Sequence, residues 1–468
     1  MATTQERLDG PQRRACSTGS AAFSIDAGVT GLHTILCFPR ERVMALKWPF
    51  GKAPREESIR IPQFYPDADE LELAQFLSED EYARIKTFTD TYILPFVWEG
   101  SAPRQLYFGT GLHWLMMRNL MLLRDVSIHG PEDTSSVAVP WEGAKDLSAL
   151  KPRSCFVSGV AELGGSGYAL DITVYRAGRP INTARARSND WATFVSDCTT
   201  KIGQGLGSRL ETTVADVWTI GQPEDANSLI RCGELEVRFG RKNVPGKIRA
   251  VERALDADPG CALAAMALDQ KTPDALRIFI EALKRDPYNA QICFEAFCAV
   301  WKSAGPQEEA MQFCRRAIEL SPGHGKAHMC APHAAHPHAD MLKHSELGYR
   351  LLPGNTFAIS NFVHYLKRYG APAEMLIELA EEGIAADPCA PSNYSLMIEL
   401  YWKVGAYREA LFVAERLQKL FEPVMNERAL YCLKQNPEVA QAIESGKYNP
   451  ATMNRQVIAE LRKKLQGN

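Results

Sequence analysis

Apolar runs with helical spacing fill the second half of the chain, and each of them closes at a proline. The prolines that close these runs are Pro259, Pro287, Pro322, Pro353, Pro388 and Pro423. Their successive spacings are 28, 35, 31, 35 and 35 residues. A period of about 34 residues that ends in proline is typical of stacked helix pairs, because one pair cannot bury its own apolar face. The pattern therefore predicts an all-α solenoid over residues 244–468, and the concave surface of such a stack usually binds other proteins.

The first half carries short apolar runs with the two-residue period of strands. In the clearest run Tyr168, Leu170 and Ile172 share one face, while Asp171 points the other way. Strands are expected at residues 92–97, 126–129, 155–162, 168–175 and 181–186, with helices at residues 112–123 and 191–210. This alternation predicts an α/β domain over residues 89–222, a mixed sheet with flanking helices.

The segment before this domain has a weaker pattern. Residues 1–88 begin with a polar stretch of small residues, which predicts a flexible leader, and continue with short β-like runs that prolines interrupt. A helix with acidic residues in its first turn is expected over residues 67–88. The sequence leaves open whether translation starts at Met1 or Met44. A polar stretch at residues 223–244 predicts the boundary between the α/β domain and the solenoid.

Short motifs in the α/β half match a known family pattern. They lie at Pro95-Phe96 and at residues 108–112, 158–160 and 175–178. Together they resemble the amino-terminal domain of the TolB family and its relatives, which precedes repeat arrays in many bacterial proteins. Thr110 departs from the family pattern, which usually has an acidic residue before Gly-Leu. The resemblance covers residues 90–215 and implies a fold without an established active site.

The repeat at residues 291–322 carries the most complete helix-pair motif. Its characteristic residues are Phe294, Cys298, Trp301, Ala310, Cys314, Ala317 and Pro322. Small residues at these positions let two helices touch, and large ones fill the gap between the helices. This arrangement resembles the tetratricopeptide repeat. A basic amphipathic helix is expected over residues 450–466, as a solvent-facing cap of the array.

The tetratricopeptide resemblance implies which residues line a groove, since positions two, five, nine and twelve of each first helix face the concave side. In the repeat at 291–322 these positions hold Ile292, Glu295, Ala299 and Lys302. For the next clear repeat two registers stay open: Ala358, Asn361, Tyr365 and Arg368, or, as Gly370 favours, Phe357, Ser360, His364 and Lys367. The last full repeat gives Ser392, Ser395, Glu399 and Trp402.

These positions supply the candidate partner-binding residues. They are Glu295, Ala299, Lys302, Ser360, His364, Lys367, Ser395, Glu399 and Trp402. Lys302, Lys367 and Trp402 are the strongest of them, because long cations and tryptophan anchor extended peptides through charge and aromatic contact. The alternative interpretation is that all of them are ordinary solvated helix residues.

Composition narrows the function classes. The formal net charge is -3, which gives no global attraction to nucleic acid, and no apolar run is long enough to predict a membrane span. The twelve cysteines include no C-x-x-C pair, which is typical of a protein in a reducing cytoplasm. We expect most of these cysteines to be small buried apolar residues. We therefore expect a cytoplasmic protein that binds a protein or peptide and no nucleic acid.

Histidines gather in one short segment. They are His324, His328, His333, His336, His338 and His344. The four-residue spacing of His324 and His328 could place both on one helix face, as a zinc site would need. Pro332 interrupts the segment, so a degenerate repeat with a polar, irregular first helix explains the same residues and is the favoured interpretation.

Motifs of catalysis and of cofactor binding are weak. The Gly109-Thr110-Gly111 step before a helix could present backbone N–H groups to a phosphate, but Trp114 stands where a dinucleotide motif needs glycine. We found no nucleophile elbow, zinc-protease motif or phosphate-binding loop. The sequence therefore predicts a non-enzymatic scaffold or adaptor without a cofactor. The alternative is a ligand or metal sensor that uses the α/β domain or the histidine segment, with the repeats as relay.

Overall fold

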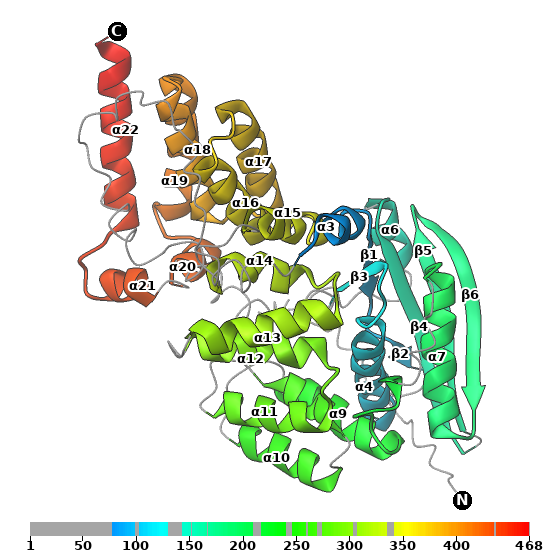
Figure 1. Cartoon of the computed structure of the whole chain (residues 1–468). Coiled ribbons are helices and arrows are strands. Elements are labelled where there is room, and N and C mark those ends of the chain that lie inside the picture. The colour runs from blue at the N-terminus through cyan, green and yellow to red at the C-terminus, as the bar shows by residue number, and fades with distance from the viewer. Residues whose placement is uncertain are drawn as a thin grey trace, which may run out of the picture.

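The computed structural model describes residues 77–98, 103–129, 143–150, 152–165, 167–208, 217–239, 246–258, 261–268, 274–302, 307–334, 341–434 and 437–467. Within them, an α/β body with a mixed sheet precedes an array of stacked helix pairs that ends at helix α22 (Figure 1). This confirms the predicted fold class. The predicted leader lies outside the described residues, and of the predicted helix at 67–88 the described part is α3 (Glu79–Ile85).

One mixed sheet forms the α/β body. Its strands are β1 (Thr89–Ile93), β2 (Val97–Trp98), β3 (Val126–His129), β4 (Cys155–Gly164), β5 (Gly167–Arg176) and β6 (Arg179–Ser188). The strand order is β3-β1-β4-β5-β6, and β2 pairs with β4 beyond the end of β1. Strands β1 to β4 pair in parallel, whereas β4, β5 and β6 form an antiparallel meander.

The predicted strand at 92–97 is divided in two. β1 ends at Ile93 and β2 begins at Val97. Pro95 lies between them and has no N–H group, so it cannot donate to the hydrogen-bond ladder. Phe96 turns into the core instead, where only 1% of its surface is exposed.

In the described part of the α/β body, three helices flank the sheet. They are α4 (Pro103–Leu120), α6 (Gly143–Leu150) and α7 (Trp191–Gly205). The Asp190 side chain caps α7 by accepting from the Thr193 amide at 2.8 Å, as its type and place predict. The helix expected at 112–123 begins nine residues earlier, at Pro103, because proline is well suited to a first helical turn. In Figure 1, α4 lies between the sheet and the helical array.

The array alternates first and second helices along the chain. Its helices are α9 (Ala226–Phe239), α10 (Lys247–Ala257), the 3₁₀ helix η2 (Ala262–Ala267), α11 (Ala275–Arg285), α12 (Ala290–Lys302), α13 (Gln307–Leu320), α14 (Gly325–Ala334), α15 (Met341–Leu351), α16 (Thr356–Arg368), α17 (Ala373–Ala386), α18 (Pro391–Lys403), α19 (Tyr407–Phe421), α20 (Glu427–Lys434), α21 (Pro437–Glu444) and α22 (Pro450–Gln466).

The prolines act as predicted, since each second helix stops two residues before its proline. For example, α11 ends at Arg285 before Pro287, and α17 ends at Ala386 before Pro388. A residue that precedes proline is pushed out of the helical region, and this sets the helix ends. The cap predicted at 450–466 is also confirmed as α22.

Glycines let α4 and α9 cross at close range. A Cβ atom on Gly111 would lie 2.3 Å from the Leu229 carbonyl oxygen, and one on Gly233 would lie 1.9 Å from the Tyr107 carbonyl oxygen. Both distances are far below van der Waals contact, so larger residues do not fit. The Gly109-Thr110-Gly111 step is therefore a packing feature in the middle of α4, and its interpretation as a phosphate loop at a helix start is wrong.

A buried ion pair joins α4 to the array. The Arg118 side chain is 1% exposed and that of Asp286, in the turn between α11 and α12, is 0% exposed. Arg118 donates from Nε to Asp286 Oδ2 at 2.9 Å and from Nη2 to Oδ1 at 2.6 Å. The same Nη2 donates to the Ile220 carbonyl at 2.6 Å, so the guanidinium also anchors the segment that leads into the array.

The apolar core continues from the sheet into the array. One cluster of buried side chains runs from Ile93 in β1 to Ala358 at the start of α16, and a second runs from Ile359 to Leu461 in α22. The last strand, β6, ends at Ser188, and the described elements from α7 onward are helices. The core divides at α16 and not at the predicted boundary of 223–244, and the Trp191 indole donates to the carbonyl of Pro223, the first residue of that boundary, at 2.7 Å.

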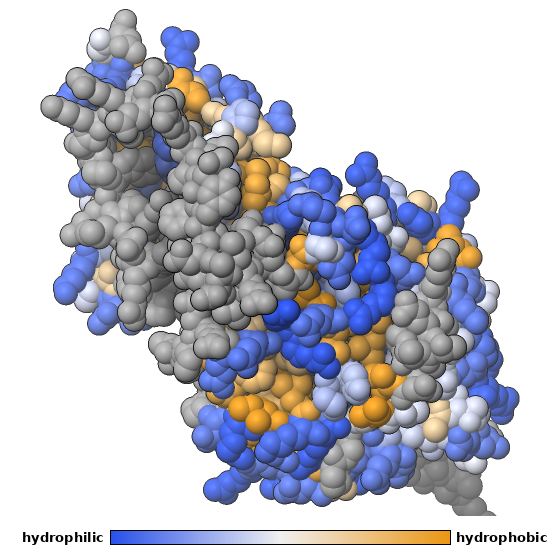
Figure 2. Space-filling view, viewed as in Figure 1, coloured by the Kyte–Doolittle hydropathy of each residue, from blue (hydrophilic) through white to orange (hydrophobic). Residues whose placement is uncertain are grey.

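Helix α3 packs on α15, far along the chain. Leu77 and Ile85 form a small apolar cluster with Leu347 and Leu351. Lys86 Nζ also pairs with Glu346 of α15 at 3.0 Å. Among the described residues, no helix combines the length and the apolar character that a membrane span requires. Figure 2 shows a largely hydrophilic face on which hydrophobic surface appears over the helical array.

Candidate partner-binding surfaces

Six of the predicted groove residues form one surface on α16 and α18, which we name the inner row. Its members are Ser360, His364, Lys367, Ser395, Glu399 and Trp402. On each helix these residues follow one another at three- or four-residue spacing, which places them on one helix face. All six side chains are partly exposed. All six predicted residues are therefore accessible on two helices that contact one another, and their role in binding a partner stays a prediction.

An ion pair joins the two helices of the inner row. Lys367 Nζ of α16 contacts Glu399 Oε1 of α18, and Lys403 Nζ lies 3.4 Å from the same oxygen. Burial alone would raise the pKa of Glu399, but the charges and hydrogen bonds of Lys367 and Lys403 lower it below its ordinary value. Glu399 is therefore anionic at neutral pH. Lys367, predicted as a cation for a partner, already has a carboxylate partner within the chain.

The aromatic members of the inner row are held by neighbouring rings. The Trp402 ring meets the Tyr407 ring of α19 edge-on, with centroids 5.7 Å apart and planes at 80°. His364 meets Tyr365 in the same manner, at 5.4 Å and 85°. Edge-to-face contacts of this kind fix the orientation of a ring. Trp402 therefore presents a pre-oriented, half-buried indole next to the Lys367–Glu399 pair.

The structure also distinguishes the two registers proposed for α16. In the first register Ala358, Asn361 and Tyr365 are buried and only Arg368 is exposed, whereas Ser360, His364 and Lys367 of the second all reach the surface. The accessible set belongs to the register that Gly370 favours. Gly370 takes a left-handed backbone conformation, with φ at 78°, directly after the helix end, and glycine adopts this conformation without strain.

The groove positions predicted on α12 are wrong for two of the three candidates. Glu295 is 0% and Ala299 6% exposed, so neither can contact a partner. The cause is packing, because α12 contacts α11, α13, α14 and η2 and lies inside the large core. Gln291 Nε2 donates to Glu295 Oε1 at 2.8 Å within this core. The third candidate, Lys302, ends α12, and its side chain lies outside the described residues.

Three histidines of the histidine segment, His324, His328 and His344, are part of the core. His328 and His344 bond to one another through their Nδ1 atoms at 2.8 Å, with stacked rings 5.0 Å apart. His328 Nε2 donates to the Pro322 carbonyl at 2.8 Å, so both ring nitrogens of His328 are occupied. His324 Nδ1 accepts from the Ala327 amide at 3.2 Å at the start of α14. Burial lowers the pKa of His328 to about 4.

These contacts do not form a metal site. The described residues contain no group of three or more His, Cys, Asp and Glu side chains placed to hold a metal ion. The side chain of His333, together with His336 and His338, lies outside the described residues. The prediction of an irregular helix in this segment is wrong. α14 is a continuous helix that contains Pro332, and the buried residues around His328 stabilise it.

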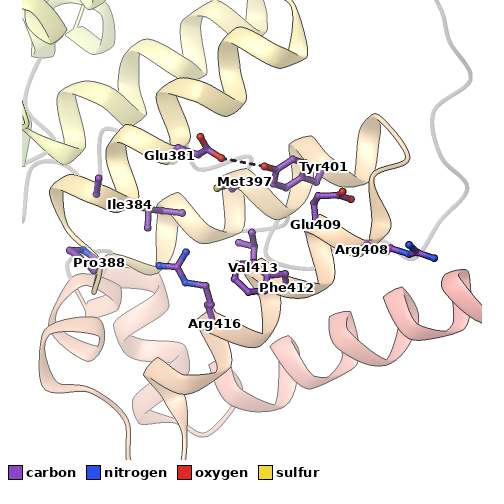
Figure 3. A pocket seen from close by; sticks show the side chains of 11 residues that line it. Glu381, Ile384, Pro388, Met397, Tyr401, Arg408, Glu409, Phe412, Val413 and Arg416 are labelled. Atoms are coloured by element: carbon purple, nitrogen blue, oxygen red, sulfur yellow. Dashed lines mark hydrogen bonds between the residues drawn. The ribbon is translucent and has the colours of Figure 1, made fainter.

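The sequence analysis missed an apolar groove on α17, α18 and α19 (Figure 3). Its volume is about 590 Å³, and Ile384, Met397 and Val413 line it together with Phe412 and Arg416. Phe412 is 62% exposed, which is unusual for so large an apolar side chain. The Arg416 guanidinium lies 5.9 Å from the centre of the Phe412 ring. A phenylalanine on the polar face of α19 was the available sequence signal.

Comparisons with known proteins place few constraints on the chain. No family model matches it, and no curated protein matches it. Among solved structures it is similar to the yeast Tom70 crystal structure, with 13% identity and a TM-score of 0.32. That match covers 55% of this chain and 59% of the Tom70 chain, so it spans less than two thirds of that protein. The resemblance to the TolB amino-terminal domain therefore stays a prediction.

Proposed function

We propose that this protein is a non-enzymatic adaptor that binds a protein or peptide at the inner row of α16 and α18. The observation that carries the proposal is the grouping of hydroxyl, imidazole, ion-pair and indole groups on one partly exposed face. Buried core positions need no such mixture. A surface that binds a peptide does need this mixture, because the peptide backbone requires hydrogen-bond partners and the peptide side chains require apolar contact.

Each part of the inner row suits a different feature of a peptide. The hydroxyl groups of Ser360 and Ser395 can donate to or accept from an extended backbone. Trp402 supplies a rigid apolar ring, and tryptophan is among the residues that contribute most to binding energy. The Lys367–Glu399 pair is only 22% and 35% exposed, so a partner that covers it would strengthen the attraction between the two charges.

The burial of α12 limits the proposed surface to the later repeats. Glu295 and Ala299 are inside the large core, whereas the inner row lies on the helices of the second core. The first repeats accordingly connect the array to the sheet, and α16 and α18 contact the partner. The occupied nitrogens of His328 argue against the alternative of a sensor that binds metal through this histidine.

The test uses the full chain and compares two surfaces. W402A and the double variant K367A/W402A remove the indole and the ion pair from the inner row, while F412A removes an exposed ring from the apolar groove on α17, α18 and α19. Tagged proteins are crosslinked in lysate, and partners enriched by the wild type are identified and then titrated as purified proteins. The inner-row variants should lose at least tenfold in affinity, and F412A should bind as the wild type does. Equal binding by all four proteins, with unchanged circular dichroism, would reject the inner row.

A further inference from the structure

Two buried thiols meet where the sheet body joins the helical array. Cys232 lies in α9, and Cys261 lies directly before η2. Their Sγ atoms are 3.0 Å apart and share a hydrogen bond, and each residue is 1% exposed. This separation is about 1 Å longer than a disulfide bond, so a small movement of the side chains would be sufficient for a bond to form.

The surroundings hold both thiols in place. The α9 backbone next to Cys232 is held against α4, because Gly233 approaches the Tyr107 carbonyl too closely for any side chain. On the other side, the Cys261 amide donates to the Asp258 carbonyl at 2.9 Å. Asp258 Oδ2 in turn accepts from the Glu224 amide at 3.1 Å, just before α9. The two sulfur atoms therefore face one another across a packed joint.

We propose that Cys232 and Cys261 form an intrachain disulfide when the folded protein meets a peroxide, and that this bond locks α9 to the start of η2. One thiolate attacks the peroxide, so that an S–O bond forms and water leaves. The second thiolate then attacks the oxidised sulfur, and a second water leaves as the S–S bond forms. The peroxide accepts the two electrons of the dithiol, and the balance is two thiols and one hydrogen peroxide to one disulfide and two waters.

The same environment makes the reaction slow. The hydrogen bond from Cys261, together with burial, raises the pKa of Cys232 well above its ordinary value, so little thiolate is present at neutral pH. Cys389, which is partly exposed, should react first. Oxidation of the pair is thus expected late, and faster at higher pH. A small oxidant is needed, because the thiols are buried on all sides.

The experiment treats the native full-length protein with hydrogen peroxide and then blocks free thiols. Mass spectrometry of a non-reduced digest should show the Cys232–Cys261 peptide pair, and hydrogen exchange in α9 and η2 should slow at least severalfold. C232S and C261S should abolish the linked peptide. C314S, which alters an equally buried thiol elsewhere in the core, should leave the linked peptide in place.

Three results would overturn the proposal. The first is fully oxidised Cys389 in folded protein without a linked peptide, and the second is a link that forms only in urea. The third is pairing of either sulfur with another cysteine. Because the linked peptide is sought in the wild-type chain, poor folding of a serine variant cannot produce any of these results.

Discussion

Replacing Arg118 by methionine tests whether the buried ion pair holds the sheet and the array together. Methionine is close to arginine in length but removes the charge and the fork of donors. Among the described residues, the Tyr288 amide, at 3.3 Å, and Asn289 Nδ2, at 3.2 Å, would then be the remaining donors to the buried Asp286 carboxylate. The Ile220 carbonyl would lose its partner as well.

The expected cost follows from this burial. Both side chains of the pair are at most 1% exposed, so water cannot replace the lost partner. Breaking a fully buried pair by removing one member costs about 3–5 kcal/mol. For a body of this size that free energy corresponds to a fall in Tm on the order of 10 °C. Scanning calorimetry of the full chain measures the shift directly.

R277M is the matched control, because Arg277 pairs with Glu252 at the surface and its side chain is 61% exposed. This variant should leave Tm unchanged, since an exposed pair contributes little. The double variant R118M/D286N should be more stable than R118M, because it no longer buries an unpaired charge. The reasoning would be refuted if R118M lowered Tm no more than R277M does.

Other variants and conditions test the remaining packing and charge arguments. G233A should destabilise the joint of α4 and α9 strongly, since its Cβ would overlap the Tyr107 carbonyl, while G165A meets no atom within 4 Å and should be neutral in urea unfolding. Acid should also destabilise the fold, because burial lowers the pKa of His113 and of His328 to about 4 from an ordinary 6.5. The unfolded chain binds more protons between these values, so stability is complete above pH 6.5 and falls towards pH 4, by about 3 kcal/mol for each histidine. H328Q should remove about half of this slope in unfolding measured across pH, and an unchanged slope would contradict the assignment. E399Q should release Lys367 and weaken partner binding with little effect on Tm, whereas a large fall in Tm would show that the pair is structural.

The sequence determined the elements because their signals are local. Proline removes an N–H group and restricts the residue before it, so Pro287 and Pro388 predicted helix ends without any knowledge of tertiary contacts. The two-residue period of Tyr168, Leu170 and Ile172 predicted β5 in the same way. The sequence could also place Ser360, His364 and Lys367 on one face of a helix, because helical spacing alone sets that relation.

Only the tertiary structure decided which of these faces is covered. Glu295 and Ser360 hold the same position in their repeats, yet Glu295 is buried in α12, which packs against four neighbouring helices, and Ser360 reaches the surface. The partners that matter lie far away in the chain: Asp286 is 168 residues from Arg118, and Glu399 is 32 residues from Lys367. Burial and pairing depend on the sum of all packed neighbours, which no local pattern contains. For that reason the spacing of residues predicted the helices, and the packing of the folded chain decided which of their residues can meet a partner.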